Sequence, residues 1–251
     1  MSTVKDPNSK GNSGFVWGLA VLLVIIAVVI GYIVYQGRGA QTDALGDYAA
    51  EDVSMEISLA DNAVTFKSAD AAKDATEVEL YEDYSCPHCG DLAKETDEQM
   101  KDAIDAGELV VHVRTLNFLD GSPNGLESIK SNTGHSSKAA AAMEQVAKTG
   151  DATLYWNLRK YLMENQSKVY NKWEMEDFAA AAKELGADDA TVKAIEEAPV
   201  GEGNPLVTSN YEKLEKETGS VSSPRIIKDG KDIPEDDKTS IMEWVNIVTE
   251  K

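Results

Sequence analysis

The sequence predicts an α/β domain that carries an inserted all-helical region and follows a single N-terminal transmembrane helix. Residues 14–36 contain no charged side chain. Two strand-like segments flank a helical segment that begins at a pair of cysteines, and residues 120–219 are alanine-rich with helical spacing. At 251 residues the chain is long enough for one sizeable domain with an appendage.

The N-terminal apolar segment is long enough to cross a bilayer. Its 22 uncharged residues from Gly14 to Tyr35 would form a helix of about 33 Å, against about 30 Å for the hydrocarbon core. A cleaved signal peptide is the alternative, because Ala40 and Ala44 offer weak cleavage signals, but its apolar core usually has only about 7–15 residues. We therefore expect a cytoplasmic tail at 1–13 and an anchor at 14–36.

Charged residues around this segment predict its orientation. Lys5 and Lys10 precede it, whereas Arg38 is followed by several acids. Because basic side chains favour the cytoplasmic side, we expect a single-pass protein of the cell membrane with an extracytoplasmic catalytic domain. Beyond the tail and the span, the chain has 22 basic and 43 acidic residues. Such an acidic surface would repel phosphate backbones, which argues against nucleic-acid binding.

The exported part is expected to begin with a linker and a hairpin. Residues 37–52 lack the periodicity of a helix or a strand, as is typical of a linker. Alternation in residues 53–59 and 64–67 predicts two paired strands, with Asp61 and Asn62 in the turn between them.

A strand, a helix and a second strand follow the hairpin. Residues 77–84 alternate apolar and acidic side chains, which predicts a half-buried strand. Pro87 suits the first turn of a helix that we expect to run to Ala106 and to stop at Gly107. Residues 109–116 then have strand character, so the three elements form one parallel crossover unit.

The middle of the chain is alanine-rich and helical, and the end returns to strand signals. An Asp229–Gly230 turn joins strands at 225–228 and 231–233, and a helix is expected at 237–249. The domain interpretation is an α/β domain of residues 53–119 and 220–251 around a helical insertion domain of residues 120–219. Within the insertion, helices are predicted at 136–149, 152–163, 174–185, 188–197 and 205–218.

The two cysteines of the chain, Cys86 and Cys89, stand at the start of the first helix. A structural disulfide would normally close a longer loop, whereas a redox pair needs both sulfurs within one helical turn. At a helix N-terminus, backbone amides and the helix dipole stabilise the Cys86 thiolate, and His88 can add a donor or a positive charge. The pKa of the first thiol in such motifs falls to about 3.5–7.5, which favours an oxidising disulfide.

Metal binding is the alternative chemistry for this motif. Two thiols and His88 could hold copper or zinc, but zinc usually needs four ligands. His112 and His135 are the remaining histidines, and each is interpreted as a surface or strand residue. We therefore predict no metal ion and no cofactor beyond a redox-active Cys86–Cys89 disulfide. A copper-binding metallochaperone and a purely structural disulfide stay open as alternatives.

The sequence resembles the DsbA family of thioredoxin-fold thiol-disulfide oxidoreductases in four features. These are the strand that ends at Tyr84, the Cys-Pro-His-Cys motif, the helical insert and the closing segment from Ser223. The resemblance covers about residues 53–250. With the N-terminal anchor, the chain is similar to the membrane-tethered, MdbA-type enzymes of actinobacteria. The resemblance implies an enzyme that donates disulfides to exported, unfolded proteins. It also implies a quinone-linked membrane partner of the DsbB or VKOR type as reoxidant. A reductase or isomerase that uses the same site is the alternative.

The resemblance also implies roles for individual residues. Cys86 would be the exposed nucleophile and Cys89 the shielded resolving thiol, with Pro87 and His88 between them. Pro224 would follow a cis peptide bond and face the disulfide, and the backbone of Ser223 would pair with an extended substrate.

Two positions depart from the family pattern. Relatives often have a buried acid six residues before the first cysteine, as a proton relay, where this chain has Leu80. Glu82 points to the same side of the strand and is a candidate substitute, the alternative being a solvated strand acid. Ser223 stands where relatives often have Val or Thr, and its hydroxyl could bond a sulfur.

Overall fold

The computed structural model describes residues 18, 44–120, 126–236 and 238–250. The predicted cytoplasmic tail lies outside these residues. So does the predicted anchor apart from Gly18, and so do the first residues of the predicted linker, up to 43. Within the described ranges, no helix combines the length and the apolar character needed to cross a bilayer.

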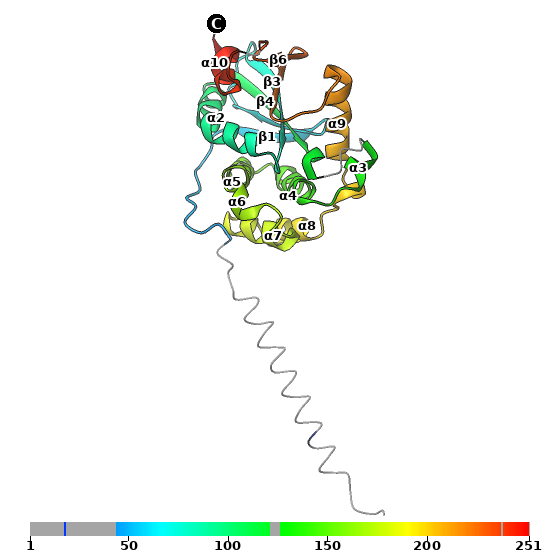
Figure 1. Cartoon of the computed structure of the whole chain (residues 1–251). Helices are drawn as coiled ribbons and strands as arrows, with labels where there is room; N and C mark the ends of the chain where they lie inside the picture. Colours follow the sequence, from blue (N-terminus) through cyan, green and yellow to red (C-terminus); the bar gives the residue numbers. More distant parts are fainter. Residues whose placement is uncertain (1–17, 19–43, 121–125, 237, 251) are drawn as a thin grey trace, which may run out of the picture. The chain divides into compact units, whose positions relative to one another are not determined.

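A six-stranded mixed sheet forms the centre of the fold, with the strand order β1-β2-β4-β3-β5-β6 (Figure 1). Strand β3 pairs in parallel with β4, and the other neighbours are antiparallel. The parallel pair is the predicted crossover unit, because helix α2 connects its two strands. The strands are β1 (Glu56–Ala60), β2 (Ala63–Lys67), β3 (Thr76–Asp83), β4 (Leu109–Leu116), β5 (Arg225–Lys228) and β6 (Lys231–Ile233).

Both predicted hairpin turns are present. Asp61 and Asn62 have φ angles of 50° and 57°, and Asp229 and Gly230 have φ angles of 50° and 77°. These left-handed conformations match the twist of the flanking strands, and Asn, Asp and Gly adopt them at low cost.

The predicted half-buried strand is confirmed only in the first half of β3. Glu77 and Glu79 alternate with the buried Val78, but the last four residues, 80–83, are all buried. The physical reason is a second apolar cluster on the other face of the sheet, in which Tyr81 packs with Leu214 of helix α9 (Pro205–Thr218). A central strand that is covered on both faces loses its alternation.

Helix α2 (Pro87–Asp105) lies against the sheet and buries Leu92, Met100 and Ile104, as predicted. The predicted C-terminal helix is shorter than expected. After a turn held by the Asp236 carboxylate, which accepts hydrogen bonds from the Thr239 backbone and side chain, Ser240 caps a 3₁₀ turn, η3 (Ile241–Glu243). Helix α10 (Trp244–Thr249) follows directly after this turn.

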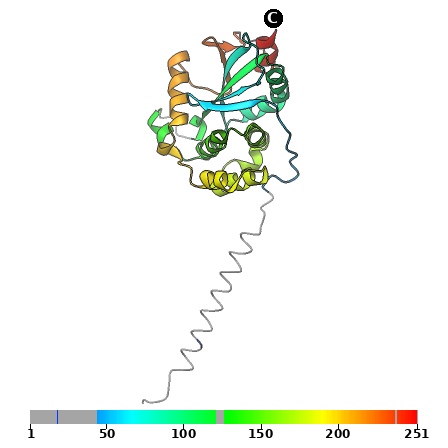
Figure 2. The ribbon, with the colours of Figure 1, turned by 180° about the vertical axis from the view of Figure 1, so that it is seen from behind.

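The helical insertion forms a layer at one end of the sheet, where α4, α5, α7 and α8 lie together, and α9 stands beside the sheet (Figures 1 and 2). The five predicted helices are present within one or two residues, and two short ones were missed. The helices are α3 (Leu126–Ser131), α4 (His135–Thr149), α5 (Ala152–Glu164), α6 (Gln166–Val169), α7 (Met175–Glu184), α8 (Asp189–Glu196) and α9 (Pro205–Thr218). Two 3₁₀ turns are also seen in this part of the described chain, η1 (Phe118–Asp120) before α3 and η2 (Gly201–Gly203) between α8 and α9.

Residues 44–52 have no helix or strand, as expected of a linker, but they are tied to the helical layer. Leu45 is buried. The Glu51 carboxylate accepts hydrogen bonds from Trp156 Nε1 at 2.8 Å and from Lys160 Nζ at 2.7 Å. The Asn157 side chain accepts a hydrogen bond from the Glu51 amide and donates one to the Glu51 carbonyl oxygen. The part of the predicted linker from residue 44 onward is therefore a packed strap, which its irregular sequence did not indicate.

Candidate active site

The two thiols lie where β3 ends and α2 begins. Cys86 occupies the N-cap position of α2, and Pro87 is in its first turn. Neither cysteine is in a disulfide in this structure. Both side chains are only 3% exposed, so the prediction that Cys86 is the exposed thiol is wrong. Its sulfur is covered from the side of Ser223, whose carbonyl oxygen lies 3.4 Å from Cys86 Sγ.

Hydrogen bonding and depth of burial together distinguish the two thiols. The pKa of Cys86 is lowered to about 5, mainly because the Cys89 thiol donates a hydrogen bond to its sulfur, with help from the Ser223 hydroxyl and two backbone amides. The pKa of Cys89 is raised by burial and by the bond that it donates to Cys86. The lowered Cys86 pKa agrees with the prediction.

His88 acts differently from the prediction. Its side chain is 83% exposed and lies 4.0 Å from the Asp91 carboxylate. The backbone amide of His88, not its ring, helps to lower the Cys86 pKa. This follows from its place in the first turn, where amides point toward the sulfur and side chains point outward.

The Ser223–Pro224 peptide bond is cis, as predicted, and it lies at the thiols. The Ser223 hydroxyl is buried, but it forms no well-aligned hydrogen bond with any described residue. It therefore remains available to a thiolate, which accounts for its lowering of the Cys86 pKa. A second cis bond, Ile233–Pro234, was not predicted.

Glu82 is buried, with 2% exposure, so its interpretation as a solvated strand acid is wrong. The Arg159 guanidinium of α5 binds the Glu82 carboxylate with both Nε and Nη2, the latter at 2.7 Å. Its Nη1 binds Asp97 of α2, also at 2.7 Å. Glu82, Arg159, Cys89 and other residues line one narrow internal gap. Glu82 is thus placed beside Cys89, together with a cation.

The buried Asp83 forms a second acidic cluster with the half-buried Asp120. The Asp83 carboxylate accepts hydrogen bonds from the Ser85 amide at 2.8 Å, the Leu119 amide at 3.2 Å and the Ser136 hydroxyl. The Ser85 hydroxyl donates to Asp120. Burial raises the pKa of Asp83 to about 7, and nearby Asp120 contributes. This cluster fixes the loop before Cys86 to the helical insertion.

Gly90 and Gln166 join the active-site helix to the insertion. Gln166 Nε2 donates to the Cys86 carbonyl oxygen at 2.9 Å. A Cβ atom on Gly90 would lie 2.7 Å from the carbonyl oxygen of Met163, closer than such atoms approach. The contact therefore requires glycine directly after the second cysteine.

Several of these residues were missed in the sequence. Arg159 carried a signal, because it lies in the apolar stripe of its helix, three and four residues before Leu162 and Met163. Asp83 and Ser136 carried none, since their burial depends on contacts between segments that are 53 residues apart.

The described residues contain no group of three or more His, Cys, Asp or Glu side chains that could hold a metal ion. His112 lies on β4 and bonds Thr65 and Glu77. His135 is buried at the start of α4 rather than on the surface or in a strand, and burial lowers its pKa to about 4.

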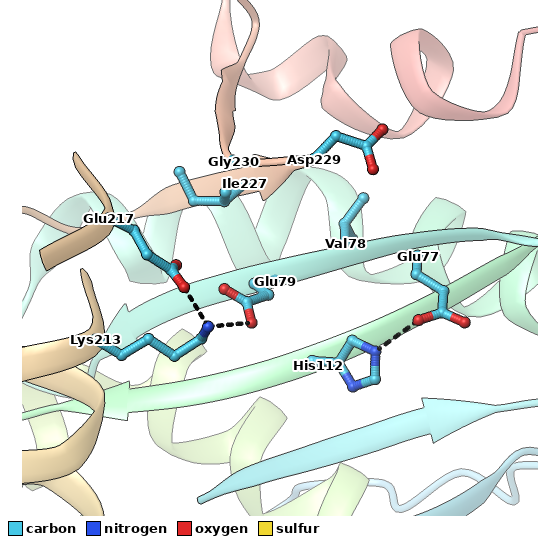
Figure 3. A pocket seen from close by; sticks show the side chains of 9 residues that line it. All are labelled: Glu77, Val78, Glu79, His112, Lys213, Glu217, Ile227, Asp229 and Gly230. Atoms are coloured by element: carbon cyan, nitrogen blue, oxygen red, sulfur yellow. Dashed lines mark hydrogen bonds and ion pairs between the residues drawn. The ribbon is translucent and has the colours of Figure 1, made fainter. Parts of the chain in front are cut away.

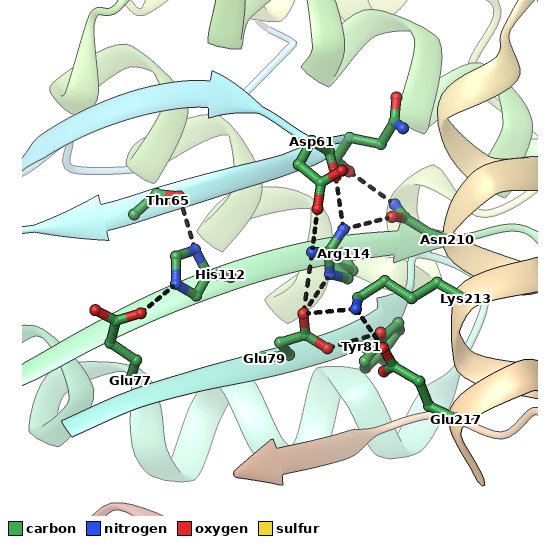
Figure 4. A network of polar contacts seen from close by, with 11 residues as sticks. Asp61, Thr65, Glu77, Glu79, Tyr81, His112, Arg114, Asn210, Lys213 and Glu217 are labelled. Atoms are coloured by element: carbon green, nitrogen blue, oxygen red, sulfur yellow. Dashed lines mark hydrogen bonds and ion pairs between the residues drawn. The ribbon is translucent and has the colours of Figure 1, made fainter. Parts of the chain in front are cut away.

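A hollow of about 330 Å³ lies on the sheet face, lined by residues from β3, β4, β5 and α9 but by neither cysteine (Figure 3). Its charged groups are mostly paired with one another. Lys213 binds both Glu79 and Glu217, and Arg114 also binds Glu79 (Figure 4). The lining is nevertheless acidic, with four carboxylates (Glu77, Glu79, Glu217 and Asp229) against one lysine.

Comparisons with known proteins identify the family of the chain. A thioredoxin family model, Thioredoxin_4, matches residues 69–249. Among solved structures, the MdbA thiol-disulfide oxidoreductase from Corynebacterium diphtheriae is 43% identical, with a TM-score of 0.73, over 84% of this chain and 100% of that one. The MdbA protein from Corynebacterium matruchotii is 37% identical, with a TM-score of 0.70, over 84% and 99%.

A more distant structure, DsbA from Mycobacterium tuberculosis, is 17% identical, with a TM-score of 0.55, over 76% of this chain and 93% of that one, and it supports the fold alone. No curated protein sequence matches the chain significantly. The chain therefore belongs to the thioredoxin family and, within it, to the thiol-disulfide oxidoreductases of the MdbA and DsbA type.

Proposed function

We propose that this protein is a membrane-anchored, extracytoplasmic disulfide donor for exported proteins. The observation that carries the proposal is the opposite shift of two thiol pKa values within one helical turn: Cys86 is lowered to about 5 and Cys89 is raised. A stabilised Cys86 thiolate favours the reduced enzyme, so its disulfide is readily given to a substrate.

The reaction uses the two thiols in sequence. A substrate thiolate attacks Cys86 Sγ of the Cys86–Cys89 disulfide, a mixed disulfide forms, and Cys89 leaves. Because its pKa is raised, Cys89 takes up a proton, and we assign Glu82 in the shared gap as the relay for it. A second substrate thiolate attacks the substrate sulfur and releases Cys86 as a thiolate. The substrate loses two electrons and the enzyme gains them.

Reoxidation and location complete the proposal. The two electrons pass to a quinone-linked membrane protein of the DsbB or VKOR type, which re-forms the Cys86–Cys89 disulfide. Residues 14–36 are the anchor that keeps the enzyme beside this partner, with the N-terminus in the cytoplasm. The uncharged length of that segment supports this assignment.

Thiol titration and trapping test the proposal. The ultraviolet absorbance of the thiolate, followed against pH in the full chain, should give a titration midpoint near 5 for Cys86. A midpoint of about 8.5, the pKa of a free cysteine, would contradict the donor function. Cys89→Ala should accumulate mixed disulfides with exported proteins through Cys86. Preferential alkylation of Cys89 in the reduced protein would reverse the assigned roles.

Two rivals are separable by direct measurement. A reductase or isomerase would keep the pair mostly reduced in cells, whereas a donor keeps it mostly oxidised, and a thiol-trapping gel distinguishes them. A copper-binding metallochaperone would retain Cu(I) after dialysis of the reduced protein, and a donor would not.

A further inference from the structure

A second hollow, of about 480 Å³, adjoins Cys86 directly. Ser85 and Pro87, the two residues that flank Cys86, form part of its wall. Asp91 and Lys94 continue the same face of α2, since they follow Pro87 at helical spacing. The opposite wall comes from the insertion and consists of Glu164, Gln166, Ser167 and Tyr170.

The wall from the insertion is held in place by its own contacts. Gln166 bonds the Cys86 carbonyl at 2.9 Å, and the Tyr170 amide donates to Gln166 at 2.8 Å. The Tyr170 ring meets the buried His135 ring edge-on at 5.6 Å between centroids, while 43% of Tyr170 stays exposed. The hollow is therefore formed before any substrate binds.

The charges of this hollow are not neutralised internally. It has two carboxylates, Asp91 and Glu164, against one cation, Lys94. Among the described residues, neither Glu164 nor Lys94 forms an ion pair, and Asp91 reaches only His88, at 4.0 Å. In the hollow on the sheet face, Glu79 and Glu217 already bind Lys213, and Glu79 also binds Arg114 (Figures 3 and 4).

We propose that this hollow is a specificity subsite that takes a basic side chain, preferably arginine, near the reacting cysteine of the substrate. A guanidinium can stack on the exposed Tyr170 ring while it pairs with Glu164 or Asp91. The inference rests on the proposed function, because a substrate cysteine that reaches Cys86 brings its neighbouring residues to Ser85 and Pro87. Ser223 contacts the Cys86 sulfur, whereas Gln166 in the wall of the hollow contacts the Cys86 carbonyl oxygen. One extended segment of the substrate can therefore pair with Ser223 and also reach the hollow.

Reduced two-cysteine peptides provide the test. Arg, Ala or Glu is placed next to one cysteine, on its N-terminal or its C-terminal side, and kcat/KM for oxidation by the oxidised full chain is measured. Each rate is divided by that peptide's rate with glutathione disulfide, since a neighbouring charge changes the cysteine itself. On at least one side, the Arg peptide should exceed the Glu peptide by about tenfold at low salt, and less at high salt.

Variants assign that preference to the hollow. Glu164→Gln should reduce the Arg-to-Glu ratio about threefold, the size of one exposed charge pair, and Tyr170→Ala should reduce it similarly. Glu212→Gln, an exposed acid on α9 outside the hollow, is the matched control and should leave the ratio unchanged. A normalised ratio near one, or a ratio unaffected by Glu164→Gln, overturns the subsite but not the donor function. Failure to oxidise any peptide overturns both.

Discussion

Glu82 and Asp83 are neighbours on β3 and both are buried, yet their surroundings differ. Glu82 shares a guanidinium with Asp97, because Arg159 binds both carboxylates. Asp83 is held by hydroxyls and backbone amides, and no cationic side chain in the described part of the chain forms an ion pair with it. The comparison teaches that burial alone does not fix the charge of an acid beside the thiols.

The consequence is a difference in what each cluster can do. The cation cluster depends on Arg159, whose own pKa is raised because it neutralises two buried acids. The hydroxyl cluster can exchange a proton near neutral pH, since burial raises the Asp83 pKa to about 7. In the first cluster Arg159 compensates the charge of two buried carboxylates, and in the second the Asp83 carboxyl titrates near neutral pH and supports the loop before Cys86.

Removing the cation should have the largest effect. Arg159→Met leaves Glu82 and Asp97 buried without a counter-charge, and we expect a loss of about 3–5 kcal/mol in the free energy of unfolding, measured with urea. Lys183→Met is the control, because Lys183 forms an exposed pair with Asp189 that is worth about 0–1 kcal/mol. Equal losses in the free energy of unfolding in both variants would show that Arg159 contributes no more to stability than an exposed ion pair does.

The next effect is a pH dependence that comes from Asp83. Its pKa is raised in the folded state above the ordinary value of 3.8, so the native protein binds the extra proton between pH 4 and 7. Stability therefore falls as pH rises through this window, by at most about 4 kcal/mol for three units. Asp83→Asn should remove this part of the fall.

Urea unfolding at pH 5 and pH 8 measures this difference. At pH 5 the variant should be the less stable protein, because the amide cannot accept the Leu119 hydrogen bond at its nitrogen. At pH 8 that disadvantage should shrink or reverse. Asp97 titrates in both proteins, so its contribution cancels in the stability difference between them. An identical difference at the two pH values, or the same change in Asp189→Asn, would contradict the assignment.

A smaller effect is expected from Ser136→Ala. This change removes a hydroxyl donor to the buried Asp83 carboxylate, and we expect a loss of about 1–3 kcal/mol above pH 7, where Asp83 is charged. The loss should be smaller at pH 5, where the carboxyl is protonated. A loss that does not change with pH would indicate a packing role instead.

The smallest effect should follow Ser85→Ala. The Asp120 carboxylate loses one donor but keeps the Ser137 amide at 3.2 Å, so the expected loss is about 0.5–1.5 kcal/mol. Thermal unfolding at constant pH is sufficient to measure it. If this loss exceeded that of Ser136→Ala, Asp120 rather than Asp83 would be the main acid of the cluster.

Local signals in the sequence predicted most of the scaffold. Alternation, turn residues and the placement of Pro87 gave the strands, the hairpins and the start of α2, because these features depend on neighbours in the chain. The position of Pro224 before a strand, together with the family resemblance, correctly predicted the cis bond.

Contacts between distant segments were not predictable in this way. Three contacts each join segments at least 53 residues apart: the hydrogen bond of Ser136 to Asp83, the pairing of Glu82 with Arg159 and the binding of the strap at Glu51. The coverage of Cys86 has the same origin, since Ser223 reaches it from 137 residues away. A single sequence contains no periodicity for such pairs.

Gly90 sets a condition for protein engineering. Because its missing side chain admits the Met163 carbonyl, the Cys-Pro-His-Cys motif is not a portable unit of four residues. A graft of this motif between scaffolds has to bring the glycine when the recipient's insertion packs this closely. A scaffold with a looser insertion can accept a larger residue there. The module that can be exchanged between such enzymes is therefore five residues long. The residue allowed at its last position depends on how closely the helical insertion packs against it.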